Sequence, residues 1–330
     1  MAILICGGAG YVGSHMVAAL IEGGRDVVVI DNLSLGHKAA VNKAAAFYQG
    51  DLRDSSLLDK VFTEHKISSV VNYAACTLVS ESVTNPIKYY ENNVGGAMVL
   101  LSAMVRHNVM NIVFSSTAAV YGEPLTMPIT EDMPTKPINP YGESKLAVEK
   151  MLSWYGAAYG LSYMALRYFN VAGAHEGGDI GECHEPESHI IPIVLQVALG
   201  KRDVMPLFGD DYDTADGTCI RDYIHVTDLA DAHIKAVDKL AAGGESVIYN
   251  LGNGAGFSNM QIIEAARRIT GVDIPIERRP RRAGDPPVLI ASSDKIKNEL
   301  GWIPKHTGLD SIISSAWKWH KANPEGFANG

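Results

Sequence analysis

The stretch Gly7-Gly8-Ala9-Gly10-Tyr11-Val12-Gly13 decides the fold of this chain. It follows a continuous apolar run, Ala2 to Cys6, and a helical pattern starts within it and reaches Leu20. A second apolar run, Val27 to Ile30, ends on Asp31, eighteen residues after Gly13. A glycine-rich turn alone is a weak signal. Strand, turn, helix, strand and acid in this order are typical of a βαβ unit that binds a dinucleotide.

Each part of this unit has a predicted task. Gly7 allows the tight turn, Gly10 lets the backbone approach a pyrophosphate, and Gly13 lets the helix pack closely on the strand. The helix N-terminus, with its free N–H groups, favours the negative charge of the pyrophosphate. Asp31 is expected to accept hydrogen bonds from ribose hydroxyls and to repel a 2′-phosphate, so NAD is favoured over NADP. A glycine-rich connection without a ligand is the simpler alternative, and the order of elements disfavours it.

The alternation of strands and helices continues through the first half of the chain. Further strands are predicted at 47–51, 69–73, 111–115 and 163–169, and helices at 55–65, 89–107 and from Pro140 onward. This rhythm predicts an α/β protein with a Rossmann-type, doubly wound parallel sheet over residues 1–172. Beyond it we expect a smaller mixed α/β C-terminal substrate lobe, 173–330, interleaved with the first domain through segments near 220–250. Within the lobe, Ser258 and Gln261 predict a capping box.

Composition excludes several classes of function. The 330 residues carry a formal charge of −9, which argues against a nucleic-acid partner. No apolar run approaches the ~20 residues of a membrane span, and no basic segment of a signal peptide precedes the first strand. The four cysteines are widely spaced, so we expect free thiols in a reducing cytoplasm, with no disulfide and no metal site.

Tyr141 and Lys145 are the candidate catalytic pair. Residues four apart on a helix share a face, so the Lys145 ammonium is expected beside the Tyr141 phenol. A nearby cation favours the phenolate, which would make Tyr141 a general base for an alcohol. Thr117, at the end of the fifth predicted strand, could hydrogen-bond the reacting oxygen. An exposed helical pair is the alternative, and the preceding dinucleotide unit disfavours it.

At this point the chain resembles the extended short-chain dehydrogenase/reductase family, and within it the UDP-glucose (UDP-galactose) 4-epimerases. The resemblance covers nearly the whole sequence. Its motifs are GGAGYVGSH at 7–15, DNLS at 31–34, GDLRD at 50–54, YYENNV at 89–94, SSTAAVYGE at 115–123, NPYGESK at 139–145, LRYFNVAGAH at 166–175, GTCIRDYIHVTDLADAH at 217–233 and RRAGD at 281–285.

The resemblance implies 4-epimerisation of UDP-hexoses through a transient 4-keto sugar, with NAD as cofactor, in galactose metabolism and in the supply of sugar nucleotides for cell-surface polysaccharide. The implied catalytic residues are Tyr141, Lys145 and Thr117. The implied cofactor-binding residues are Gly7, Gly10, Tyr11, Val12, Gly13, Asp31, Asn32, Asp51, Leu52, Tyr73, Ala74, Asn92, Ser115, Tyr141, Lys145 and Phe169. The implied substrate-binding residues are Thr117, Tyr141, Asn170, His189, Phe208, Arg221, Tyr223, Arg282, Asp285 and Leu289. For Asn92, a turn cap is an equal alternative.

Three positions modify this expectation. Thr77 stands where many members carry a lysine that reaches the cofactor ribose, so looser NAD retention is expected. His189 stands where an asparagine is usual. Leu289 is shorter than the tyrosine that accompanies restriction to glucose and galactose, so we expect UDP-N-acetylgalactosamine to be accepted as well.

The resemblance also implies a homodimer, built through helices at about 90–107 and 143–159. Apolar positions there include Val99, Leu100, Met104 and Leu146, and a core within one chain is the alternative role for them.

Two other hypotheses about the function remain open. A nucleotide-sugar 4,6-dehydratase or decarboxylase would carry an acid just after the Ser/Thr of the fifth strand, where this chain has Ala118 and Ala119. A non-catalytic NAD-sensing regulator would need no proton relay, and the intact Thr117, Tyr141 and Lys145 disfavour it. Fold alone does not separate these readings.

Overall fold

The structure, a computed structural model, describes residues 1–282 and 285–327. Its centre is a seven-stranded sheet in the order β11-β6-β5-β4-β1-β2-β3, with every neighbouring pair parallel. The strands are β1 (Ala2–Cys6), β2 (Val27–Asp31), β3 (Ala46–Gln49), β4 (Ile67–Asn72), β5 (Asn111–Thr117), β6 (Ser162–Tyr168) and β11 (Val247–Leu251). The predicted Rossmann-type fold is confirmed.

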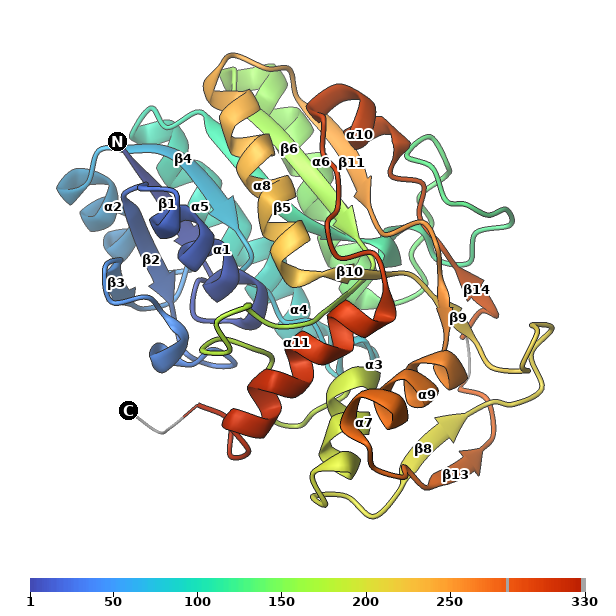
Figure 1. Cartoon of the computed structure of the whole chain (residues 1–330). Coiled ribbons are helices and arrows are strands. Elements are labelled where there is room, and N and C mark those ends of the chain that lie inside the picture. The colour runs from blue at the N-terminus through green and yellow to red at the C-terminus, as the bar shows by residue number, and fades with distance from the viewer. Residues whose placement is uncertain (283–284, 328–330) are drawn as a thin grey trace.

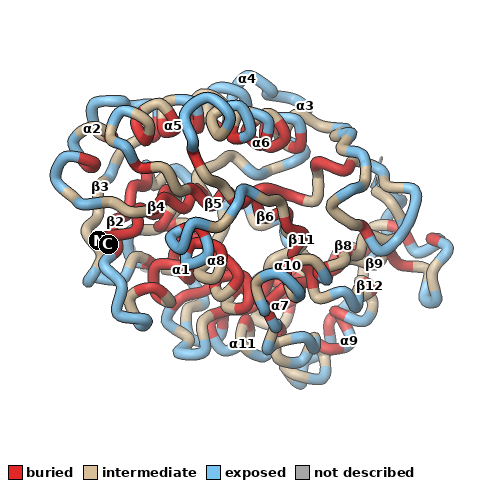
Figure 2. The backbone as a smooth tube through the Cα atoms, turned by 90° about the horizontal axis from the view of Figure 1, so that it is seen from above, coloured by how far each residue is buried: buried red, intermediate tan, exposed pale blue. Residues whose placement is uncertain are grey.

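Helices cover both faces of this sheet (Figures 1 and 2). On one face lie α1 (Tyr11–Glu22) and α8 (Val226–Ala241), and on the other lie α2 (Ser55–Glu64), α5 (Gly96–Arg106) and α6 (Pro140–Tyr159). All residues of β1 and β2 are buried, which explains why these strands are continuous apolar runs and not alternating ones. The sheet is therefore the buried middle layer of three.

The long helix predicted at 89–107 is present, but its first part is π-helical. The chain forms α3 (Val79–Thr84), α4 (Pro86–Tyr89), a π-helical turn (Tyr90–Gly95) and then α5. The buried Asn93 side chain bonds to both backbone groups of Cys76, at 2.7 and 3.0 Å, and to the Ser144 hydroxyl at 3.0 Å. These bonds anchor the turn against α6. π-Helical turns are frequent at functional sites, and this one presents Asn92 to a cavity described below.

The C-terminal lobe gathers beside one end of the sheet (Figure 1). Its helices α7 (Ile190–Ala198), α9 (Asn259–Thr270) and α11 (Leu309–Ala322) enclose a second core, and α10 (Asp294–Leu300) lies near β11. Short strands pair as β10 (Tyr223–His225) with β7 (Asn170–Ala172), β13 (Ile276–Arg279) with β8 (Met205–Phe208), and β9 (Ile220–Arg221) with β12 (Phe257–Ser258) and β14 (Val288–Leu289). The Ser258–Gln261 capping box is present at the start of α9.

Some of the segments near 220–250 return to the first domain. β11 joins the sheet edge beside β6, and α8 packs on the sheet. Residues 220–225 form two separate strands, β9 and β10, which pair outside the seven-stranded sheet. The lobe boundary at residue 172 stays a prediction. Residues 283–284 of the RRAGD motif lie outside the described residues.

Three apolar positions predicted to form a dimer contact are buried within the chain. Leu100 and Met104 belong to the main core, and Leu146 to a small cluster with Val120 and Tyr121. Leu100 and Met104 face inward because the inner stripe of α5 packs on the sheet, and Leu146 faces Val120 and Tyr121, which follow β5. In the part of the chain that the structure describes, no helix is long and apolar enough to cross a membrane.

Candidate active site

The glycine turn lies where the chain switches direction within the sheet. β1 is followed by β2 and β3 on one side, and β4 lies on its other side, so the carboxyl ends of β1 and β4 form the crevice where doubly wound folds bind ligands. Gly7 has φ +79°, and a Cβ there would lie 2.7 Å from the Ala74 nitrogen. A Cβ at Gly13 would lie 2.1 Å from the Gly7 oxygen. Both glycines are therefore required by the turn itself.

Gly10 differs from the other two glycines. A Cβ there would meet the protein only at the Gly7 oxygen, 3.5 Å away, so the turn does not require glycine at this position. Gly10 instead borders two cavities and is the N-cap of α1, whose first N–H groups have no side-chain cap. The missing side chain leaves room beside a helix N-terminus, which fits the pyrophosphate of a dinucleotide.

The first cavity, of about 100 Å³, collects the candidates for the adenosine half of NAD. They are Gly7, Gly10, Asp31, Asn32, Asp51, Leu52, Tyr73, Ala74 and Asn92. The Asp31 carboxylate accepts one backbone N–H on each oxygen, from Ala9 at 2.9 Å and from Leu33 at 2.8 Å. Each oxygen can accept a further hydrogen bond, so Asp31 is oriented and still able to bind ribose hydroxyls.

Asp51 is held in the same cavity by its neighbours. The Arg53 guanidinium donates to both of its oxygens at 2.8 Å, and Asn32 donates to one at 3.1 Å. These bonds, the one from Arg53 above all, hold the pKa of Asp51 well below its usual range. Asp51 therefore remains an anionic hydrogen-bond acceptor at neutral pH.

The second cavity, of about 430 Å³, is here called the active-site cavity. It opens from the glycine turn and passes the ends of β5 and β6 to the C-terminal lobe. The predicted site residues that line it are Gly7, Gly10, Tyr11, Val12, Gly13, Tyr73, Ser115, Thr117, Tyr141, Lys145, Phe169, Asn170, His189, Arg221 and Leu289. All sixteen predicted cofactor-binding residues thus line one of these two cavities, and so the residues present fit an NAD molecule.

Tyr141 and Lys145 enter the active-site cavity from the first turns of α6. Asn139 caps this helix by accepting the Gly142 N–H at 2.9 Å, and Pro140 occupies its first position. The buried Lys145 amine donates to the Ser115 carbonyl at 2.9 Å. Thr117 accepts the Ala119 N–H at 3.1 Å, and its hydroxyl also lies beside the Tyr141 phenol.

The electrostatics of this pair differ from the prediction. Burial raises the pKa of the Tyr141 phenol, and the nearby Thr117 hydroxyl only partly opposes that rise. Burial also lowers the pKa of Lys145 to about 7, with Cys76 and Glu149 partly offsetting it. The predicted lowering of the Tyr141 pKa by Lys145 is thus absent from the protein alone, because both groups lose hydration in the same enclosed place.

Four predicted substrate residues do not line the cavity. Tyr223 is buried in the lobe core because the strand breaks at Asp222, whose carboxylate accepts the backbone N–H groups of Asn253, Gly254 and Ala291. The other three residues pair with neighbours. The Arg282 guanidinium lies 4.2 Å from the Phe208 ring centre, and Asp285 accepts a hydrogen bond from Arg221, which does line the cavity.

Sequence reasoning missed three polar residues that line the active-site cavity. Tyr168 ends β6 and contacts the Ser115 hydroxyl through its own. Glu182 and His184 lie in the connection before α7. Their signal in the sequence is the alternation of Glu and His over residues 182–189, GluCysHisGluProGluSerHis, which the cysteine spacing did not reveal.

Comparison with known proteins identifies the family. The model of the NAD dependent epimerase/dehydratase family matches residues 3–252, more than half of the chain. This chain belongs to the NAD dependent epimerase/dehydratase family. Two curated relatives, each matched over nearly its full length, are named UDP-glucose 4-epimerase. The protein of Halalkalibacterium halodurans is 57% identical over 99% of this chain and 98% of the relative, and that of Lacticaseibacillus casei is 55% identical over 100% and 99%.

Solved structures of the epimerase/dehydratase family agree with this. A crystal structure of a UDP-glucose 4-epimerase has a TM-score of 0.98 and 54% identity, covering 99% of this chain and 100% of its own. The enzyme of Brucella ovis, solved with NAD, has a TM-score of 0.94 and 46% identity over 96% and 97%. The enzyme of Bifidobacterium longum, solved with NAD+ and UDP, has a TM-score of 0.93 and 40% identity over 99% and 100%. The resemblance to UDP-glucose 4-epimerases and NAD as the cofactor are confirmed.

Proposed function

We propose that the protein interconverts UDP-galactose and UDP-glucose at the sugar C4, with Tyr141 as the group that takes and returns the 4-hydroxyl proton. The observation that carries the proposal is the enclosed cavity in which Tyr141, Lys145 and Thr117 converge. NAD, when bound, would accept a hydride from the sugar and give it back, and its oxidised form would add a positive charge to the same cavity.

Thr117 and Tyr141 divide the work on the sugar oxygen. The hydroxyl of Thr117 can donate to the oxygen at C4, which holds the sugar hydroxyl toward the phenol. Deprotonation of Tyr141 needs a positive charge nearby, because burial raises its pKa. The Lys145 amine and the oxidised cofactor are the two sources, and the same phenol gives the proton back when the other face of C4 is reduced.

The C-terminal lobe supplies the groups for the nucleotide. Arg221 lines the cavity, and its guanidinium also contacts the Asp285 carboxylate and the Ile220 carbonyl. Arginine binds phosphate oxygens through two parallel N–H donors, so Arg221 suits one end of the UDP diphosphate. We place Asn170 and His189 along the same wall, and Arg282, Phe208 and Asp285 behind it as supports.

Leu289 sets the sugar selectivity in this proposal. It lines the active-site cavity and packs against a small cluster that contains Val120, Ile129 and Leu146. Leu289 in β14 pairs with Arg221 in the neighbouring strand β9, which keeps Leu289 close to the proposed nucleotide-binding wall. A leucine leaves more space there than a tyrosine, so we propose that UDP-N-acetylgalactosamine and UDP-N-acetylglucosamine are also interconverted.

We further propose a homodimer that pairs exposed apolar side chains of the helical face opposite α1 and α8. Trp154 on α6 is 75% exposed, Met98 on α5 is 52% exposed and Ile87 on α4 is 68% exposed. Exposed apolar groups on neighbouring helices favour an interface. Light scattering should give twice 35.5 kDa, and Trp154→Glu should shift the mass toward that of one chain. The four free cysteines support a reducing, cytoplasmic location.

The test is product identity. Purified protein with UDP-galactose should form UDP-glucose, with no net rise in NADH absorbance. Accumulation of a dehydrated 4-keto sugar, or carbon dioxide released from UDP-glucuronate, would favour the alternative enzymes. Ala118 and Ala119 line the cavity where such chemistry would place an acid. NAD binding without turnover of any UDP-sugar would favour a regulator.

A further inference from the structure

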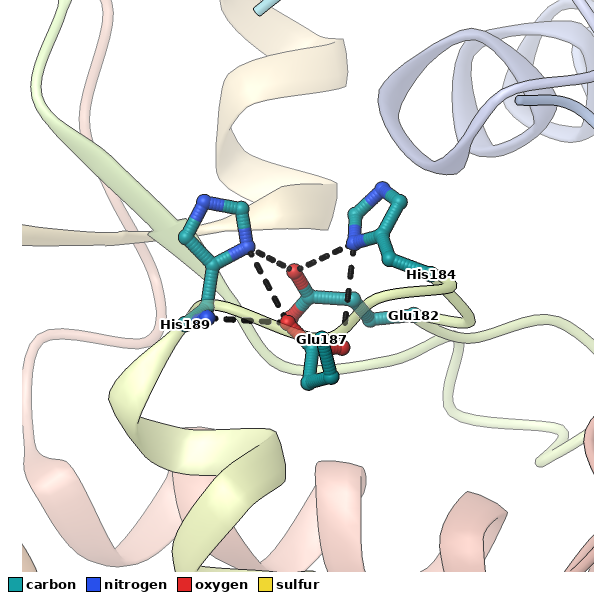
Figure 3. Close-up of side chains that lie close together, drawn as sticks. All are labelled: Glu182, His184, Glu187 and His189. Carbon is teal, nitrogen blue, oxygen red and sulfur yellow. Dashed lines mark hydrogen bonds and ion pairs between the residues drawn. The ribbon is translucent and has the colours of Figure 1, made fainter. Parts of the chain in front are cut away.

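Four side chains from one short segment converge beside the active-site cavity. They are Glu182, His184, Glu187 and His189, here called the glutamate–histidine cluster, and each offers one donor atom within 4.8 Å of the others. Figure 3 shows the two imidazole rings on either side of the carboxylates. We propose that this cluster binds one divalent transition-metal ion of the zinc class.

The distances between the donor atoms suit such an ion. Tetrahedral zinc with bonds of about 2.0–2.2 Å to nitrogen and oxygen places its ligands about 3.4 Å apart. The His184 Nδ1 lies 3.3 Å from a Glu182 oxygen and 3.8 Å from a Glu187 oxygen. The His189 Nδ1 lies 3.6 Å from the other Glu187 oxygen, and its 2.6 Å contact with Glu182 would lengthen. Small side-chain rotations therefore complete the site.

One donor atom of the cluster makes no hydrogen bond. The Nδ1 of His184 is buried, and among the residues that the structure describes it has only ion-pair contacts, at 3.3 Å with Glu182 and at 3.8 Å with Glu187. Buried polar atoms are usually satisfied, and an unsatisfied one needs an explanation such as an ion. The atom is directed at the two carboxylates, as a metal ligand would be.

The surroundings orient the carboxylates. One oxygen of Glu187 accepts the backbone N–H groups of Ser188 and His189, both at 2.8 Å, and the other oxygen faces His184. The side chains of Glu182 and Glu187 are only 4% and 3% exposed. Ligands that are held by such outer bonds bind metals more tightly. Imidazole with carboxylate is a donor set for zinc and related ions, and a poor one for magnesium or calcium.

Ion pairing without a metal is the competing state of the cluster. Burial alone would lower the pKa of His184, but its contacts with Glu182 and Glu187 outweigh burial and raise that pKa to about 10. Both imidazoles must be neutral to bind a metal. A divalent ion would therefore displace protons from the cluster when it binds.

A bound ion would act on the active-site cavity. Glu182, His184 and His189 line that cavity together with Arg221 and Tyr141. The His184 ring also lies edge-on to Tyr11, at 6.3 Å between ring centres, and Tyr11 belongs to the glycine turn. An ion would fix the connection before α7 against the wall where the UDP-sugar is proposed to bind.

The test measures zinc, not catalysis. Full-length protein freed of metal by dialysis against a chelator is equilibrated with micromolar ZnCl2, and bound zinc is counted by mass spectrometry. We expect about one zinc per chain, and an absorption spectrum of tetrahedral cobalt when Co²⁺ is used instead.

Two variants remove ligands, and two are controls. Glu187→Gln keeps a carbonyl oxygen for the Ser188 and His189 N–H groups, so the loop should fold, and His184→Ala removes a ring. Each should weaken zinc binding by at least about tenfold. His107→Ala removes a surface histidine paired with Asp59, and Cys183→Ser removes a thiol that does not converge with the cluster, so neither should change binding.

Two results would overturn the proposal. One is the absence of stoichiometric zinc on the unmodified protein, and the other is a zinc affinity of both ligand variants equal to that of the unmodified protein. Thermal unfolding of each variant shows whether it is folded. Because zinc is counted directly, the 4-epimerase proposal could fail while this one holds, and the reverse.

Discussion

The side-chain amine of Lys145 lies 2.9 Å from the carbonyl oxygen of Ser115, and this contact joins the helix that carries Tyr141 to the strand that ends on Thr117. The amine is almost completely buried, and it lies 5.0 Å from the Phe114 ring centre. A group that is charged in the unfolded chain is thus held in an enclosed place. Burial of Lys145 beside the catalytic residues is therefore expected to destabilise the folded protein.

The Lys145 pKa makes this cost depend on pH. It is about 7 in the folded protein and about 10.4 in an unfolded chain, so between these values only the unfolded chain holds the proton. The destabilisation is complete below pH 7 and disappears as the pH rises toward about 10. Without NAD, the free energy of unfolding should rise from pH 7 to 9, and Lys145→Met should flatten that rise. Lys150→Met, on the exposed side of α6, should not, and an unchanged slope in Lys145→Met would contradict the assignment.

A buried ion pair joins α6, the helix that carries Tyr141 and Lys145, to β6. Arg167 on β6 donates to both oxygens of Glu149 on α6, at 2.9 and 2.6 Å, and both side chains are at most 5% exposed. Glu149→Ala leaves the guanidinium buried without its partner, so the free energy of unfolding should fall by about 3–5 kcal/mol. Urea denaturation measures this. The double change Glu149→Leu with Arg167→Met should restore much of the loss, and a loss below about 1 kcal/mol in the single variant would show that the pair is unimportant.

We predict that Thr77 makes NAD retention looser. It is exposed at the rim of the active-site cavity and has neither the charge nor the reach of the lysine that the family resemblance leads us to expect there. After gel filtration, the activity of the unmodified protein should increase when NAD+ is added. Thr77→Lys should keep more NAD, as measured by the absorbance of released cofactor. Full activity of the unmodified protein after extensive washing, without added NAD+, would count against this.

Leu289→Tyr tests the sugar selectivity. The larger ring should fill the space beside the sugar, suppress turnover of UDP-N-acetylgalactosamine and spare UDP-galactose. The matched control is Val288→Tyr, because successive side chains of a strand point to opposite faces and Val288 does not line the cavity. The measurement is the ratio of the two turnover rates. No turnover of UDP-N-acetylgalactosamine by the unmodified protein would contradict the proposal.

Local pattern was enough for the parts of the site that the sheet positions. Gly7, Gly13 and Asp31 follow strand ends, and Tyr141 and Lys145 follow a helix start that Asn139 and Pro140 define. Such residues could be placed from sequence because the carboxyl ends of parallel strands meet at one edge.

The C-terminal lobe was harder to predict, for physical reasons. Arg221 and Tyr223 would share a face in one strand, but the hydrogen bonds of Asp222 divide the strand and turn Tyr223 into the core. Those partners lie 31 to 69 residues away, so no local pattern contains them. The rise in the pKa of Tyr141 could not be predicted from sequence either, because burial of its phenol depends on the whole fold.

The most direct measurement of the central claim is the turnover of Tyr141→Phe with UDP-galactose, beside its contents of NAD and bound UDP. The change removes only the phenol oxygen, so turnover should fall by about 10²–10⁴-fold while both ligands still bind. Tyr155→Phe, on the same helix and outside the cavity lining, should retain full activity. Turnover of Tyr141→Phe equal to that of the unmodified protein would contradict the account, because the proton would then be taken by another group.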